Sequence, residues 1–275
     1  MHKRAKKALE LFLAEDIGKG DITSRLLNKK KISAYIISRQ TGIIAGVRYA
    51  KEVFLSRKCK VKILKKDGQT IKPNEKIMII SGPAYMILSC ERTVLNLLSR
   101  MSGIATQANK LVKIIKKANP NTDLYSTRKT APGLRLFDKE AVEIGGGNRH
   151  RMSLDQMIMI KDNHIAVTKS LRELIRLSKK HYNTIEVEVE NLQDAIIAAV
   201  EGASIIMLDN IPPTTIRKIV KTLEDLDLRK RIKLEASGGI NISNVKAYAK
   251  TGVDMISIGS LTSSVSGLDL SLEVS

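Results

Sequence analysis

The second half of the chain alternates between short apolar runs and segments with helical periodicity. The apolar runs, which are typical of buried strands, lie at residues 123–127, 156–160, 184–189, 204–208, 232–236 and 254–258. Amphipathic segments separate most of them, at residues 168–179, 191–201, 213–224 and 243–250, with Thr168 and Asn191 as suitable helix N-caps. Six such repeats predict parallel strands joined by helical crossovers. A barrel and an open, doubly wound sheet both fit this pattern.

The first hundred residues mix the strand and helix periods and predict a small, separate α/β domain. Strand-like runs lie at residues 31–38, 60–64 and 76–81, with a turn signal at Asp67-Gly68. A short helix fits residues 47–55, and an amphipathic helix is predicted near the start of the chain from the apolar face of Ala5, Ala8, Leu9 and Phe12.

A long helix is predicted over residues 91–118, with a break near Gly103 and an end at Asn119-Pro120. It separates the two regions described above. We therefore expect an N-terminal domain of residues 1–105 and a larger domain of residues 106–263. The last residues, 264–275, are expected to pack on the first domain.

Every predicted strand of the second half is followed, or ended, by a charged residue or a turn of small residues. In chain order these are Arg128-Lys129, Lys161-Asp162, Glu188, Asp209, Ser237-Gly238-Gly239 and Gly259-Ser260. The active sites of α/β barrels and the ligand sites of open α/β sheets lie at the carboxyl ends of the strands. A single polar strand end is commonplace, but six that converge on one edge predict a functional site.

Two of these turns have the composition of a phosphate site. Ser237-Gly238-Gly239 lies between a strand and a helix expected to begin near Ser243, and Gly259-Ser260 repeats the arrangement one unit later. Glycine allows the backbone to approach a ligand closely, and the first turn of a helix offers free N–H groups to an anion. An ordinary tight turn would explain either segment alone, whereas two in the final units favour phosphate binding.

The connection between the first two predicted strands contains three successive glycines followed by Asn148, Arg149, His150 and Arg151. Glycine permits unusual backbone angles, and the basic side chains can donate charge-assisted hydrogen bonds to an anion. A passive flexible loop is the alternative explanation. His150 by itself would more often be structural than catalytic, and His164 is expected to orient the loop after Lys161.

The charges at this edge suggest a reaction type. Arg128, Lys129, His150, Arg151 and Lys161 can bind carboxylates and a pyrophosphate, since arginine suits the planar carboxylate group. Glu188 and Asp209 can serve as oxygen ligands for magnesium or as acceptors for ribose hydroxyls. Cations that face carboxylates beside a phosphate turn are typical of transfer chemistry on a phosphorylated sugar.

Composition limits the alternatives. The formal net charge of +19 favours an anionic partner, but aromatic residues make up only 3% of the chain and tryptophan is absent. A platform for single-stranded nucleic acid stacks bases on aromatic rings and is therefore disfavoured. Two cysteines without a CxxC pair suit a reduced, cytoplasmic protein, and no apolar run reaches the ~18 residues of a membrane span.

Several long motifs resemble the quinolinate phosphoribosyltransferase family. They are LAEDIGKGDITS (13–24), ERTVLNLLSRMSGIAT (91–106), STRKTAPGLR (126–135), GGGNRHRMSLDQMIMIKDNH (145–164), EVEVEN (186–191), IIMLDN (205–210), SGGI (237–240) and TGVDMISIGSLT (251–262). The resemblance covers almost the whole chain. Three positions depart from the frequent family residues, namely Ser126, Ser153 and Gln156, and they put only the fine geometry of the loops in doubt.

The resemblance implies an N-terminal α/β sandwich-like domain and an irregular, six-stranded parallel α/β barrel. It also implies a homodimer or a larger homo-oligomer in which one subunit's N-terminal domain caps the partner's barrel. The expected enzyme is a pentosyltransferase that joins quinolinate to 5-phosphoribosyl-1-pyrophosphate with Mg²⁺. The products would be nicotinate mononucleotide, pyrophosphate and carbon dioxide, a step of de novo NAD synthesis.

Carried over by position, the resemblance also implies a role for each motif residue. The quinolinate carboxylates would be bound by Arg128, His150, Arg151 and Lys161, with Arg92 reaching into the partner's site. The phosphoribosyl donor would be bound by Lys129, Glu188, Asp209, Ser237, Gly238, Gly239, Gly259 and Ser260. The residues expected to act in catalysis, by electrostatics and orientation, are Lys129, Lys161, Glu188 and Asp209, of which Glu188 and Asp209 would hold Mg²⁺ directly or through water.

Three alternatives remain at this point. A relative with the same fold, such as the molybdenum-associated one, could act on another acid, although Lys161 suits a second carboxylate. A nicotinate phosphoribosyltransferase would need fewer cations. A basic nucleic-acid-binding protein would need an extended basic stripe, whereas the informative cations here follow strand ends. We therefore expect no nucleic acid and no membrane as partner.

Overall fold

The computed structural model describes residues 3–27 and 29–275, which divide into two compact units. Of the described residues, the first unit contains 3–27, 29–109, 130–146 and 264–275, and the second contains 110–129 and 147–263. Residues 130–146 thus belong to the first unit, whereas the sequence pattern predicts them in the larger domain of residues 106–263. None of the helices in the described ranges has the length and apolar character needed to cross a membrane.

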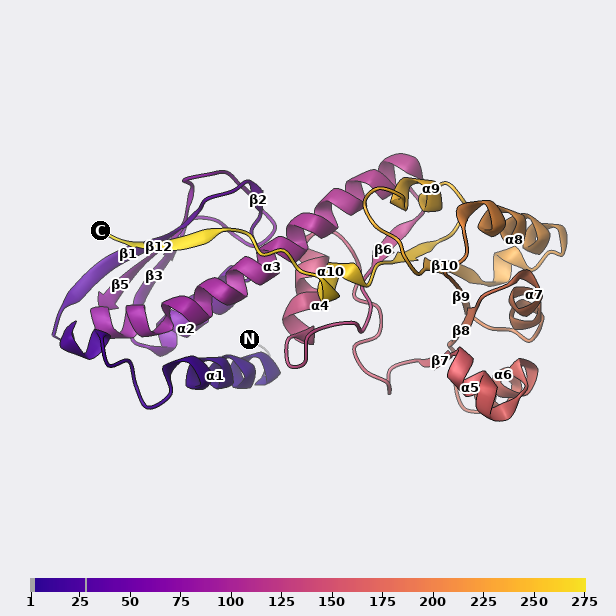
Figure 1. The fold of residues 1–275 in the computed structure, drawn as a ribbon, viewed down its shortest axis with the longest axis horizontal. Helices are drawn as coiled ribbons and strands as arrows, with labels where there is room; N and C mark the ends of the chain where they lie inside the picture. Colours follow the sequence, from indigo (N-terminus) through magenta and orange to yellow (C-terminus); the bar gives the residue numbers. More distant parts are fainter. Residues whose placement is uncertain (1–2, 28) are drawn as a thin grey trace. The chain divides into compact units, whose positions relative to one another are not determined.

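The first unit is built on an antiparallel sheet with the strand order β12-β1-β5-β3 (Figure 1). Its strands are β1 (Lys31–Ser38), β3 (Lys60–Ile63), β5 (Lys76–Pro83) and β12 (Leu270–Val274). The last strand pairs with the first, so that Ala34 lies opposite Val274. A separate pair joins β2 (Gly42–Ile43) to β4 (Thr70–Ile71).

Helix α1 (Lys3–Ile17) of the first unit buries one apolar face. Ala5, Leu9 and Leu13 are its buried residues, as the four-residue spacing predicts. The other helices are η1 (Ser24–Leu27), α2 (Val47–Ser56), α4 (Arg135–Ile144) and the long α3 (Ala84–Ala118), whose last nine residues belong to the second unit.

The expected break near Gly103 is wrong, because α3 runs without interruption from Ala84 to Ala118. The glycine has a packing role instead. A Cβ atom at this position would lie 2.0 Å from the carbonyl oxygen of Ser266. Gly103 therefore lets the segment that precedes β12 pass close to the helix, which a larger side chain would prevent.

The second unit is a six-stranded parallel sheet with the order β6-β11-β10-β9-β8-β7 (Figure 1). Its strands are β6 (Asp123–Tyr125), β7 (Ile158–Ile160), β8 (Ile185–Val189), β9 (Ile205–Asp209), β10 (Lys233–Ser237) and β11 (Met255–Ser257). The first strand, β6, pairs with the last strand, β11. This pairing is expected in a barrel, where the sheet curves back on its first strand. The expected α/β fold with an irregular six-stranded barrel is confirmed.

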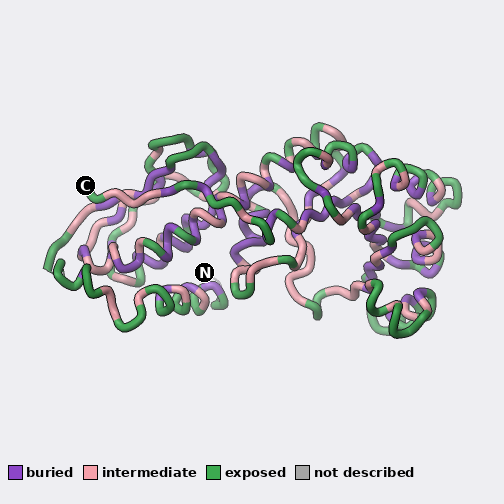
Figure 2. Tube along the Cα trace, in the orientation of Figure 1, coloured by how far each residue is buried: buried purple, intermediate pink, exposed green. Residues whose placement is uncertain are grey.

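From β7 onward helices connect the successive strands of this barrel, and α10 follows the last strand. They are α5 (Asp162–Thr168), α6 (Leu171–Lys179), α7 (Leu192–Val200), α8 (Pro213–Asp225), η2 (Arg229–Arg231), α9 (Val245–Ala249) and α10 (Ser260–Ser263). Figure 2 shows the strands largely buried and the helices exposed on their outer faces.

One of the two predicted helix caps is confirmed and the other is wrong. Asn191 caps α7, since its side chain accepts a hydrogen bond from the Asp194 N–H at 2.9 Å. Thr168 ends α5, and the residue that caps α6 is Ser170, which accepts from the Glu173 N–H at 3.2 Å. The extra helix α5 explains the difference, because the periodic segment contains two short helices separated by Lys169 in the left-handed region.

Candidate active site

A cavity of about 540 Å³ opens at the carboxyl ends of the barrel strands. Twelve of the thirteen residues proposed from sequence line it, all of them in the second unit: Arg128, Lys129, His150, Arg151, Lys161, Glu188, Asp209, Ser237, Gly238, Gly239, Gly259 and Ser260. The thirteenth, Arg92, is not among its lining residues and lies exposed on α3 in the first unit.

The lining has two levels, because residues two apart on a strand point to the same side. Upper-level residues lie at or just past the strand ends, at positions 161, 188, 209, 237 and 259. The residue two positions earlier on four of these strands also lines the cavity, namely Met159, Met207, Glu235 and Ser257. The upper level is predicted from the sequence, whereas the lower level is not.

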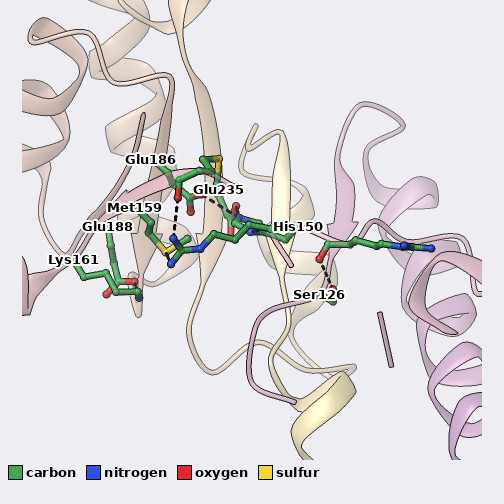
Figure 3. A network of polar contacts seen from close by, with 10 residues as sticks. Ser126, His150, Met159, Lys161, Glu186, Glu188 and Glu235 are labelled. Atoms are coloured by element: carbon green, nitrogen blue, oxygen red, sulfur yellow. Dashed lines mark hydrogen bonds and ion pairs between the residues drawn. The ribbon is translucent and has the colours of Figure 1, made fainter. Parts of the chain in front are cut away.

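Lys161 is held at the rim by two different contacts. Its side-chain Nζ forms an ion pair with Oε2 of Glu188 on the neighbouring strand (Figure 3). Its main-chain N–H donates to Nδ1 of His164 at 2.9 Å, one turn into α5. The expectation that His164 orients the loop after Lys161 is therefore confirmed.

The glycine-rich segment between β6 and β7 forms hydrogen bonds to β6, the first strand of the barrel. Asn148 forms a parallel bridge with Tyr125, and the buried Ser126 hydroxyl donates to the carbonyl of Arg149 at 2.7 Å (Figure 3). Ser126, one of the positions that departs from the family pattern, thus contributes directly to the geometry of this loop.

Arg151 follows this connection and lines the cavity with its side chain half-buried. Its Nη1 donates to the carbonyl of Met157 at 3.0 Å, and its Nη2 lies 3.3 Å from the sulfur of Met159. Burial and the charge of Arg128 lower its pKa from the usual value, while the nearby Glu186 acts in the opposite direction. Two guanidinium groups close enough to interact make a suitable site for a planar carboxylate.

The expected phosphate turn after β10 has the backbone that the sequence predicts. Gly238 and Gly239 both have positive φ, and a Cβ on Gly238 would lie 2.6 Å from the backbone nitrogen of Asn210. The expected helix near Ser243 is shorter than predicted, since α9 begins at Val245 and has five residues. A phosphate would therefore depend on the N–H groups of the glycine turn itself.

Lys129 and the final turn of the barrel are packed together. A Cβ on Gly259 would lie 3.0 Å from Cδ of Lys129, and the Thr262 hydroxyl donates to the Lys129 carbonyl at 2.8 Å. The Lys129 side chain is exposed at the mouth of the cavity. It can therefore meet an anion next to the turn that Gly259 and Ser260 form.

The residues that sequence reasoning missed are two glutamates beneath this rim. Glu186 on β8 and Glu235 on β10 have no exposed surface, and both lie beside the ring of His150 (Figure 3). A signal was present, because Glu186 and Glu235 are acids inside apolar strand runs, two positions before Glu188 and Ser237 respectively. The two-residue strand period would have placed both on the cavity side.

A barrel with cations, carboxylates and glycine turns at one end defines an enzyme that acts on anionic, phosphorylated substrates. Models of the quinolinate phosphoribosyl transferase N-terminal and C-terminal domains match residues 21–102 and 104–273. The chain belongs to this family.

Individual relatives agree over nearly the full length. A probable nicotinate-nucleotide pyrophosphorylase [carboxylating] of Methanothermobacter thermautotrophicus is 42% identical, covering 96% of both chains. The protein of the same name from Bacillus subtilis is also 42% identical, covering 99% of this chain and 94% of its own. The solved structure of the nicotinate-nucleotide pyrophosphorylase from Francisella tularensis superposes with a TM-score of 0.92 at 38% identity. The match covers 99% of this chain and 96% of that chain.

Proposed function

We propose that the barrel cavity is the active site for the reaction of this family. The chain is a phosphoribosyltransferase that converts quinolinate and 5-phosphoribosyl-1-pyrophosphate into nicotinate mononucleotide, pyrophosphate and carbon dioxide, a step of NAD synthesis. The observation that supports this location is the convergence of twelve sequence-proposed residues on one cavity.

The side of the cavity formed by Arg128, His150, Arg151 and Lys161 would receive quinolinate. Quinolinate carries two carboxylates on adjacent ring carbons, so it needs more than one cation. Two guanidinium groups can each bind a carboxylate through parallel N–H groups, and Lys161 adds a point charge. Lys161 is paired with Glu188, and this partner would be exchanged for a substrate carboxylate.

The part of the cavity near the glycine turns would receive the phosphoribosyl donor. The N–H groups of the Gly238-Gly239 turn and the turn at Gly259-Ser260 suit the 5-phosphate. Lys129 would face the pyrophosphate, while Glu188 and Asp209 would accept from the ribose hydroxyls. Because β6 pairs with β11, Lys129 stands beside the turn at Gly259 and Ser260.

In the reaction the pyridine nitrogen forms a bond to the anomeric carbon as the bond from that carbon to pyrophosphate breaks. Pyrophosphate leaves with the electron pair, and Lys129 would stabilise its charge. Glu188 and Asp209 would stabilise the positive charge that develops on the ribose. The bond to one ring carboxyl then breaks, carbon dioxide leaves, and the ring carbon takes a proton.

Mg²⁺ fits the donor set of this rim. Glu188 and Asp209 end neighbouring strands and offer carboxylate oxygens, the ligands that Mg²⁺ prefers. One oxygen of Asp209 accepts from the Asn210 amide at 2.6 Å, which orients the group. When bound, the ion would neutralise phosphate charge, and these two residues would hold it directly or through water.

The assembly we propose is a cytoplasmic homodimer or larger homo-oligomer whose active sites are shared between subunits. Arg92 would complete the partner's quinolinate site. The two cysteines, both free and buried, suit a reducing compartment.

Subunit complementation tests the shared site. Arg92→Ala and Lys161→Ala variants are co-expressed with different tags. If each site uses Arg92 from one chain and Lys161 from the other, random mixing restores about one quarter of the wild-type activity. Mixtures as inactive as the separate variants would show that both residues act from the same chain.

The function itself is tested by a product assay with quinolinate or nicotinate as the acceptor. Mononucleotide and carbon dioxide from quinolinate only is the expected result. The Lys161→Ala variant should raise the KM for quinolinate by roughly 10- to 100-fold, the value of a charged hydrogen bond, and leave the KM for the phosphoribosyl donor nearly unchanged. Lys218→Ala, on the exposed side of α8, is the matched control. Turnover of nicotinate instead would overturn the assigned substrate.

A further inference from the structure

Beneath the proposed quinolinate site lies a closed cluster of two acids and one histidine. The side chains of Glu186 and Glu235 are fully buried, and the His150 side chain is 6% exposed. The His150 Nε2 atom lies 3.2 Å from Oε2 of Glu186 and 3.4 Å from Oε2 of Glu235 (Figure 3). No carboxylate oxygen of either glutamate has a hydrogen-bond partner among the described residues. Such groups are costly to bury and call for an explanation.

A metal site is the first explanation to consider, since one donor atom of each residue lies within 4.8 Å of the others. The other nitrogen of the ring argues against it. Nδ1 of His150 lies 2.8 Å from the main-chain nitrogen of Arg151 and accepts its N–H. The neutral ring then carries its proton on Nε2, and a protonated nitrogen cannot bind a metal. Nδ1 is thus held by the main chain, while Nε2 lies within ion-pair distance of both glutamates and, like their oxygens, has no hydrogen-bond partner among the described residues.

The contact at Nδ1 leads directly to the substrate side of the cavity. His150 has φ of 52°, in the left-handed region that residues other than glycine seldom adopt. The ring contacts with Glu186 and Glu235 hold this backbone in place from below. The next residue is Arg151, whose guanidinium lines the cavity. The position of the buried ring therefore sets the direction in which the Arg151 side chain leaves the loop.

We propose that Glu186 and Glu235 are positioning residues for quinolinate, which act by holding His150 so that Arg151 points into the cavity. This inference rests on the proposed function of the same site. It gives His150 a different role from the direct carboxylate ligand that the family resemblance implies, because neither ring nitrogen faces the cavity free of a protein contact. The negative charge of Glu186 also opposes the effect of Arg128 on the Arg151 guanidinium.

The test uses Glu186→Gln and Glu235→Gln in the full-length chain, which keep the side-chain volume and remove the charge. The expected result is a rise of the quinolinate KM on the order of 10- to 100-fold, the effect of misplacing a binding group by about 1 Å. The KM for the phosphoribosyl donor should change little. If the variants only lost structure, the fraction of active enzyme and the apparent kcat would fall, and the quinolinate KM would not change selectively.

Glu201→Gln is the matched control. Glu201 is a buried acid of the same unit, paired with Arg172 and Arg176, and it is not among the residues that line the cavity. Its variant should lose stability and keep the quinolinate KM.

A double-variant cycle tests whether the glutamates act through His150. In a His150→Gln background, Glu186→Gln should add little to the quinolinate KM, because the residue it holds is already gone. Fully additive effects would overturn the proposal. So would a metal bound at one equivalent per chain in the purified wild type and lost in Glu186→Gln.

The proposed function can fail separately. If the wild-type chain makes no mononucleotide from quinolinate, the function is wrong and the KM comparison does not arise. If the wild type is active and both glutamine variants keep its quinolinate KM, only the positioning role is wrong.

Discussion

The two units bury acids in opposite ways. In the first unit Asp138 of α4 is fully buried, and Arg100 satisfies both of its oxygens, with Nε to Oδ1 at 2.7 Å and Nη2 to Oδ2 at 2.9 Å. In the second unit Glu186 and Glu235 are equally buried and share one imidazole, with their oxygens lacking hydrogen bonds to any described residue.

The difference separates a structural pair from a functional cluster. A bidentate ion pair with arginine offsets much of the free-energy cost of removing a carboxylate from water. Two carboxylates beside one histidine repel each other and leave that cost in place. A chain that keeps such a cluster next to its cavity gives up stability, which natural proteins do mostly at functional sites.

The largest effect is expected when the structural pair is broken. Arg100→Ala leaves the Asp138 carboxylate buried without its partner, which should cost about 3–5 kcal/mol of stability. Thermal unfolding, with hydrogen exchange of the α4 amides, measures this. The double replacement Arg100→Met with Asp138→Leu is the control, and it should recover most of the loss. A single variant as stable as the wild type would mean that Asp138 is not held by this pair.

The second effect concerns pH and belongs to the cluster. Burial alone would lower the pKa of His150, but Glu186 and Glu235 outweigh it and raise the pKa to about 9. Burial also raises the pKa of Glu186. Both groups then favour their protonated forms in the folded state. The contribution of His150 to stability is complete below about pH 6.5 and is lost as pH rises through about 9.

A measured titration of His150 by NMR decides how strong this contribution is. The contact between Nδ1 and the Arg151 N–H opposes it, because a cationic ring has no lone pair at Nδ1. The His150→Gln variant should lose the dependence of stability on pH between 6.5 and 9. A His150 pKa at or below its usual 6.5 would show that the main-chain contact outweighs the carboxylates.

A smaller effect is expected at another buried acid of the first unit. Glu140 accepts a hydrogen bond from the Tyr49 hydroxyl at 2.6 Å and also pairs with Arg48. Tyr49→Phe removes one of these two partners and should cost about 1–2 kcal/mol. Tyr35→Phe, in β1, is the control and should be near neutral in calorimetry. An equal loss in both variants would mean that the hydroxyl at Tyr49 has no special role.

The smallest change in stability is expected for Glu235→Gln, a variant for which a large change in the quinolinate KM is expected. Glu235→Gln relieves the repulsion with Glu186 and leaves His150 one carboxylate, so stability should shift by less than about 1 kcal/mol in either direction. Calorimetry of this variant and of Arg100→Ala gives the comparison directly. A loss of stability as large as that of Arg100→Ala would mean that Glu235, like the pair of Arg100 and Asp138, mainly stabilises the fold.

Much of the fold could be predicted from the sequence, because local periodicity reflects local geometry. Both bounds of all six strand runs of the second half lie within two residues of β6 to β11. The predictions were wrong where a contact between residues far apart in the sequence determines the local structure. Gly103 suggested a helix break, and its purpose depends on Ser266, more than 160 residues later in the chain.

The sequence by itself determined the upper level of the site, since strand ends can be counted along the chain and their polar residues stand out. Only the tertiary structure decided what lies beneath them. Glu186 and Glu235 come from separate strands, and His150 comes from a loop whose conformation no period predicts. Their relation to one another depends on how the barrel brings β8, β10 and the loop together around one buried space, which a linear pattern does not contain.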